Sequence, residues 1–218
     1  MNRRASRQLI DSAEKAVEQE LGRIDFARRR AGILTIPVNE DVIGWVGLNR
    51  GVAYGDSMLR INPMTGVRHQ PLERFIAELH GERFHAYLPA TTGMQLGYLM
   101  LEQRYVQWVF GEDTDHHETA RTLAEAMRAY GIPFMQANGT LGAVYETMRQ
   151  PGTSKDDYSI IAALVMLGRP EEAKAVIQKE LKEQAQFCAD TGIRRDDIPA
   201  CEQFDRFVAN LCRHEGWK

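Results

Sequence analysis

The pattern of hydrophobic and polar positions along the chain changes near Phe110. Before it, short segments rich in β-branched and aromatic residues are separated by Gly, Pro and Asn, a pattern typical of strands joined by tight turns. After it, apolar residues recur every three or four positions between helix-capping residues. The pattern therefore predicts a sheet-containing first half and a helical second half.

The chain is expected to begin with a helix over residues 8–30. One apolar stripe has the spacing of a helix face, and Gly32 would end the pattern; the stripe consists of Ile10, Ala13, Val17, Leu21 and Ile24. In this interpretation Arg28, Arg29 and Arg30 lie in the last turn, where cations complement the helix dipole.

The rest of the first half predicts strands and one short helix. The helix begins at Pro71 and ends before Gly81, because Pro is tolerated at the first helical position and Gly favours the C-terminal end. Short connections favour antiparallel pairing, since parallel strands need long crossovers. The strand segments are 33–38, 42–48, 58–62, 83–88, 97–101 and 105–110.

The second half predicts a series of capped helices. Asp115 and Glu118 have the spacing of a capping box, and Gly131 with Pro133 predicts the end of that first helix. Ser154 can cap a later helix that ends at Gly168. The other helices are expected at 140–148, from Pro170 onward and at 200–213.

These elements predict an α+β fold, with a mostly antiparallel sheet and an N-terminal helix followed by an all-helical C-terminal half. The sheet region is expected over residues 1–112 and the helical region over 113–218, in one continuous body. Within it, Pro151 and Gly152 mark the preferred internal boundary.

Composition narrows the class of protein. The 218 residues are 44% hydrophobic and 26% charged with a net charge of −3, which favours an ordinary globular protein and disfavours binding to nucleic acid or anionic membranes. No apolar run approaches the ~18 residues of a membrane span, and the N-terminus lacks the apolar core of a signal peptide. A cytoplasmic protein is expected, with Cys188, Cys201 and Cys212 as reduced thiols.

The densest group of polar residues lies between a predicted strand and a predicted helix, in the sequence GEDTDHHET. It supplies six candidate binding residues: Glu112, Asp113, Asp115, His116, His117 and Glu118. One interpretation is a solvated loop whose acids cap the next helix, and another is an acidic patch that faces a partner. A metal site is not predicted, because adjacent helical histidines point about 100° apart and no HExxH pair is present.

Other chemistry has weaker signals. His69, His80 and His85 lie within 17 residues and could serve an enzyme together with nearby Asp or Glu. The aromatic residues near the strands, Trp45, Tyr54, Tyr105 and Trp108, are expected either in the core or in an aromatic-lined site. No GxSxG, GxxxxGK[ST] or GxGxxG motif occurs after a strand, so no cofactor is predicted.

Two resemblances carry implications. The stretches INPMTGVRH (61–69), LGYLM (96–100), YVQWVF (105–110) and YGIPF (130–134) resemble small bacterial α+β proteins of the polymorphic-toxin immunity type. That resemblance implies binding and neutralising a partner without chemistry. Residues 159–183 look like a single tetratricopeptide-type helical hairpin, whereas a stable stack of such repeats needs roughly three copies.

The sequence therefore favours a non-enzymatic cytoplasmic protein-binding module, an immunity protein in its most specific form. Its partner would be a protein such as a basic toxin domain, and residues 112–118 would provide the contact surface. The alternatives are a hydrolase or transferase with a non-motif His/Asp/Glu site, and a structural homodimer formed through the helical half.

Overall fold

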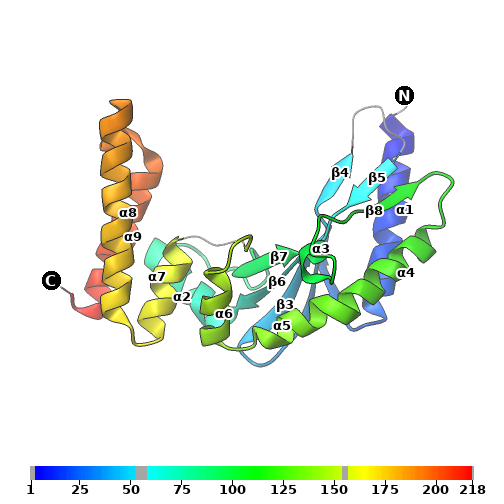
Figure 1. The fold of residues 1–218 in the computed structure, drawn as a ribbon, viewed down its shortest axis with the longest axis horizontal. Helices are drawn as coiled ribbons and strands as arrows, with labels where there is room; N and C mark the ends of the chain where they lie inside the picture. The colour runs from blue at the N-terminus through cyan, green and yellow to red at the C-terminus, as the bar shows by residue number, and fades with distance from the viewer. Residues whose placement is uncertain (1–2, 53–57, 154–156, 218) are drawn as a thin grey trace. The chain divides into compact units, whose positions relative to one another are not determined.

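The computed structural model describes residues 3–52, 58–153 and 157–217, and it confirms the α+β class (Figure 1). Residue contacts group the described chain into two compact units: residues 3–69 with 87–153, and residues 70–86 with 157–217. This grouping differs from the expected regions 1–112 and 113–218, because helix α2 (Gln70–His80) packs with the C-terminal helices α7 (Asp157–Met166) and α9 (Pro199–Glu215).

Helix α1 (Arg3–Gly22) is shorter than expected, and the prediction of helix to residue 30 is wrong. The Leu21 carbonyl accepts hydrogen bonds from the Ile24 and Phe26 amides, in a turn where Asp25 has a φ of 71°. Residues 27–30 then form strand β1 (Ala27–Arg30), because pairing with the next strand satisfies their backbone groups.

Five antiparallel strands form sheet A, in the order β1-β2-β3-β6-β7. They are β1, β2 (Ile33–Pro37), β3 (Val42–Gly47), β6 (Met64–His69) and β7 (Thr92–Gln95). On one face, Gly44 makes room for helix α5 (Ile132–Ala137): a Cβ on this glycine would lie 2.4 Å from the Met135 sulfur. The opposite face meets the segment after Tyr87, whose carbonyl accepts a 2.9 Å hydrogen bond from the Trp45 indole.

Sheet B has three antiparallel strands, β4 (Arg50–Val52), β5 (Met58–Ile61) and β8 (Trp108–Gly111), in the order β4-β5-β8. Alternate residues of β5 and β8 face inward, and all are at most 8% exposed; they are Leu59, Ile61, Trp108 and Phe110. Helices α1 and α4 (His116–Ala126) pack beside each other and contact this sheet (Figure 1).

Several expected strands are different in the structure. Residues 83–88 form no strand, and the expected strand over 97–101 is replaced by the short helix α3 (Leu96–Leu99). The strand lies instead at β7, whose backbone comes so close to β6 that a Cβ on Gly93 would lie 2.7 Å from the Thr65 carbonyl oxygen. The expected strand at 105–110 is confined to β8.

The expected helix end at Gly131 is also wrong. Helix α4 continues through a π-helical turn (Met127–Gly131) into α5 (Ile132–Ala137), and the Ile132 amide donates to the Met127 carbonyl across that turn. Pro133 follows directly after this wider turn, in the first turn of α5. Helix α6 (Leu141–Met148) follows close to its expected bounds, and the Thr140 side chain caps it.

The second unit is helical. It contains α2, α7 (Asp157–Met166), α8 (Pro170–Thr191), the short 3-10 turn η2 (Arg195–Asp197) and α9 (Pro199–Glu215). An aromatic cluster joins three of these helices: the Tyr158 ring lies 4.7 Å from that of His80 and 4.9 Å from that of Phe207. The predicted hairpin turn at Gly168 is confirmed. Ser154, which was expected to cap the helix before this turn, lies outside the described residues.

None of the described helices combines the length and the apolar character that a membrane span requires. The three cysteines are free thiols, as expected.

Candidate functional site

The acidic segment, residues 112–118, begins in a turn that is held by two hydrogen bonds between the Thr114 hydroxyl and the Gly111 backbone. The Gly111 amide donates a 2.8 Å hydrogen bond to the Thr114 hydroxyl, and that hydroxyl donates to the Gly111 carbonyl at 3.0 Å. Asp115 then accepts hydrogen bonds from the His117 and Glu118 amides, at 2.9 and 3.1 Å. The predicted helix cap is therefore confirmed, and it places one carboxylate at the positive end of α4.

His116 connects this turn to the N-terminal helix. Its Nδ1 lies 3.0 Å from the Ser12 hydroxyl on α1, and its Nε2 lies 2.8 Å from the Gly111 carbonyl oxygen. The ring also meets Phe110 edge-on, with centroids 5.6 Å apart. Because the carbonyl can only accept, Nε2 carries the proton in this arrangement and Nδ1 accepts from the serine.

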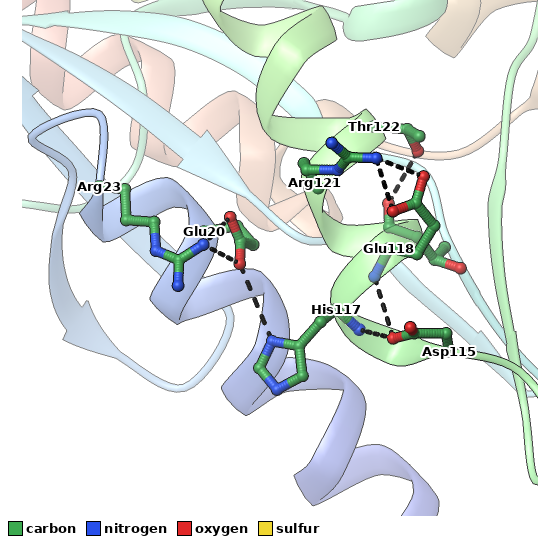
Figure 2. A network of polar contacts seen from close by, with 8 residues as sticks. Glu20, Arg23, Asp115, His117, Glu118, Arg121 and Thr122 are labelled. Carbon is green, nitrogen blue, oxygen red and sulfur yellow. Dashed lines mark hydrogen bonds and ion pairs between the residues drawn. The ribbon is translucent and has the colours of Figure 1, made fainter.

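His117 points toward a different group from its neighbour, as the helical geometry predicts (Figure 2). Its Nδ1 lies 3.8 Å from the carboxylate of Glu20, which also accepts two hydrogen bonds from Arg23 at 2.7 and 2.9 Å. Glu20 is buried, and Arg23 supplies the opposite charge for its carboxylate. The two histidines thus serve separate contacts, and no group of three potential metal ligands occurs among the described residues.

Glu118 is also paired. Both of its oxygens accept 2.7 Å hydrogen bonds from Arg121 one helical turn later (Figure 2). This hydrogen bonding and the nearby negative charges of Glu118 and Glu125 raise the pKa of the Arg121 guanidinium. The negative charge of Glu118 is therefore largely balanced within the helix.

Glu112 and Asp113 differ from the other acids of the segment. Both side chains are exposed at the tip of the closed turn, and neither carboxylate has a hydrogen bond or ion pair with another described residue. They follow β8 directly, beside the outer face of sheet B. On that face Met58 and Val109 are 40% and 37% exposed. Arg60, which is partly exposed, lies opposite Val109 on the same face, so apolar and charged side chains occur there together.

The sequence did not indicate Met58 and Val109 as site residues. What would identify them is the alternating direction of side chains along β5 and β8, in which every second residue faces away from the core. Recognising it requires knowing that these two strands pair, with Met58 opposite Gly111 and Arg60 opposite Val109.

The histidines considered for an enzyme have other surroundings. His69 is buried at the end of β6, and burial lowers the pKa of its imidazole. His80 packs in the aromatic cluster of the second unit, and His85 is exposed there. The structure therefore does not gather these three residues within one compact unit.

The aromatic residues of the first half also lie apart. Trp45 belongs to sheet A, whereas Trp108 belongs to β8 and is buried on the inner face of sheet B. Tyr105 is exposed in the segment that precedes β8. Tyr54 lies outside the described residues.

Comparisons of the chain with protein-family models, with curated proteins and with solved structures find no match.

Proposed function

We propose that this protein is a non-enzymatic cytoplasmic module that binds a basic protein partner through Glu112 and Asp113. The observation that carries the proposal is the presentation of these two carboxylates. They are exposed and unpaired within the described chain, and the turn that bears them is fixed by Thr114, Asp115 and His116.

A fixed turn favours binding because less conformational freedom is lost when the partner docks. Ordering a flexible side chain at an interface costs about 0.5–1.5 kcal/mol, and a preformed backbone avoids the larger cost of ordering a loop. The adjacent exposed Met58 and Val109 would supply the apolar part of the same surface. The two carboxylates would then provide charge complementarity at its rim.

In its most specific form, the proposal is that the partner is a toxin domain with a basic, nucleic-acid-directed surface and that this chain neutralises it. The support is the resemblance of four stretches to immunity-type proteins together with the acidic surface. A protein that occupies a toxin's basic surface blocks access of the toxin's polyanionic substrate through electrostatic competition.

The test is a comparative capture experiment in host lysate. The baits are the wild-type protein, the variant Glu112→Lys/Asp113→Lys, and the control Glu40→Lys/Glu82→Lys, which reverses two other exposed acids and so has the same net charge. We expect a stoichiometric partner on the wild type and on the control, and its loss from the first variant.

The purified partner then gives the quantitative result. Exposed ion pairs contribute roughly 0.2–1 kcal/mol each, so turning two attractions into repulsions should cost about 2 kcal/mol, or roughly thirtyfold in Kd at low salt. This loss should shrink at high salt because the charges are screened. Equal Kd values for all three proteins at low salt would refute the assigned surface. A captured partner that leaves growth unaffected when expressed alone would refute the toxin-neutralising form.

A further inference from the structure

A cavity of about 710 Å³ lies in the first unit, at the edge of sheet A formed by β7. Its walls come from β6, β7, α3 and α5 and from the loops that follow α3 and α6, and Figure 1 shows α3 next to the ends of β6 and β7. This volume is within the range of about 300–1,000 Å³ that is usual for small-molecule sites. The cavity is separate from the acidic segment, since the residues that line it include none of residues 112–118.

The walls combine polar groups with adaptable apolar side chains. Met64 and Met94 contribute thioethers, and Leu99 and Phe134 add further apolar surface. All four side chains are only partly buried by the rest of the described protein, so they retain apolar area that a ligand would remove from water. Methionine fills irregular contacts and packs well against aromatic rings.

No charged residue is among the described residues that line the cavity. An ion entering it would lose part of its hydration without gaining a partner of opposite charge from these residues, which is unfavourable. The lining therefore selects against carboxylates, phosphates and ammonium groups and in favour of uncharged molecules.

Three glutamine amides supply polar recognition. The Gln95 carbonyl oxygen accepts only a long 3.4 Å hydrogen bond from Asn62, and the amides of Gln103 and Gln150 have no side-chain hydrogen bond to a described residue. Each amide offers both donors and an acceptor. A ligand edge that carries a neutral donor beside a neutral acceptor would match them.

The backbone at Gln103 is a further indication. Its φ is 45°, in the left-handed region that costs an L-residue other than glycine or asparagine roughly 1–2 kcal/mol. The side chain is exposed, so packing does not require glutamine here. The Gln103 amide donates a 3.1 Å hydrogen bond to the Met100 carbonyl, and this turn holds the glutamine at the cavity rim.

We infer that this cavity binds an uncharged organic molecule that has an aromatic or aliphatic body and a neutral hydrogen-bonding edge. The apolar walls hold the body of the ligand, and the glutamine amides at the rim hydrogen-bond its edge.

The test uses two fluorescent probes that share one aromatic frame. N-phenylnaphthylamine is neutral and has an N–H donor, whereas anilinonaphthalenesulfonate has the same frame with an added negative charge. In titrations of the full chain, the neutral probe should bind at least about tenfold more tightly than the sulfonate.

Two matched variants locate the binding. Gln103→Lys places a cation at the cavity rim, and lysine must adopt the same left-handed backbone as glutamine. The ratio of the two probe affinities should shift toward the sulfonate by about tenfold or more. Gln136→Lys makes the same change at an exposed position on α5 that is not part of the lining, and it should leave both affinities unchanged.

The inference fails if the wild type binds neither probe, or if it prefers the sulfonate. It also fails if the Gln103→Lys and Gln136→Lys variants shift the preference equally, since the probes would then bind outside this cavity. Circular dichroism of both variants should match that of the wild type. A further variant, Gln103→Asn, keeps a neutral amide at this position and should prefer the neutral probe as the wild type does, because asparagine tolerates the left-handed backbone.

Discussion

A methyl group added at Gly97 is expected to destabilise the first unit, whereas the same group at Gly142 is expected to stabilise it. A Cβ at Gly97 would lie 2.3 Å from the Arg104 carbonyl oxygen and 2.8 Å from the Val106 amide nitrogen. Both are backbone atoms, so no side-chain rotation relieves the overlap. At Gly142, near the start of α6, nothing lies within 4 Å of the added carbon.

The magnitudes follow from these contacts. Overpacking costs about 1–3 kcal/mol, and moving the 104–106 segment also breaks the 3.2 Å hydrogen bond from the Arg104 amide to the Gly97 carbonyl, worth roughly 0.5–1.5 kcal/mol. Gly97→Ala should therefore lower the free energy of unfolding by about 2–4 kcal/mol. Gly142→Ala should raise it by roughly 0.5 kcal/mol, because alanine is the better helix former.

The assay is urea unfolding followed by tryptophan fluorescence in a Trp217→Phe background. The remaining tryptophans, Trp45 and Trp108, both belong to the first unit, so the signal reports on that unit. Equal midpoints for the two alanine variants would refute the reasoning, since it depends entirely on the different space around two glycines. A Gly97→Ala variant that is more stable than the wild type would contradict it directly.

Three further predictions concern buried and connecting polar groups. His116→Ala should lower the free energy of unfolding by about 2 kcal/mol, because it removes two hydrogen bonds and a ring contact. A double-mutant cycle with Ser12→Ala should give a coupling energy of roughly 1 kcal/mol, whereas additive effects of the two substitutions would exclude the contact. Burial raises the pKa of Glu18 despite the ion pair with Arg28, so its ionised form opposes folding. Glu18→Gln should therefore stabilise the protein at pH above that raised pKa, and urea midpoints should show the gain vanishing below the ordinary value of 4.5. Burial lowers the pKa of His69, so the free energy of unfolding should fall as the pH drops below 6.5 toward the lowered pKa. If a His69→Asn variant showed the same loss in urea titrations, His69 would not be its cause.

Local signals explain which parts of the fold the sequence could predict. The cap at Asp115 and the helix that begins at Pro71 depend on residues within one turn, and the structure confirms both. Strand β7 has the sequence TGMQ, which has little strand propensity, and it forms because the β6 backbone lies close enough to pair with it. The three arginines of β1 likewise form a strand only because β2 offers an edge.

The candidate site shows the same division. The acids of residues 112–118 are visible in the sequence, but the contact of His116 with Ser12 joins positions 104 residues apart. The cavity at β7 combines residues from four helices and strands and two loops, and none of them belongs to a recognisable motif. Such sites arise from tertiary packing, which no spacing along one segment encodes.

The acidic segment has two roles that mutations must keep separate. Reversing Asp115 would remove a helix cap worth about 1 kcal/mol as well as a charge, so lost binding could result from a loosened turn. Glu112 and Asp113 have no such structural contact among the described residues, so their reversal changes the surface charge alone. If His116→Ala also weakens binding while leaving both carboxylates in place, the fixed turn itself contributes to affinity. If it lowers stability but leaves Kd unchanged, charge alone accounts for recognition.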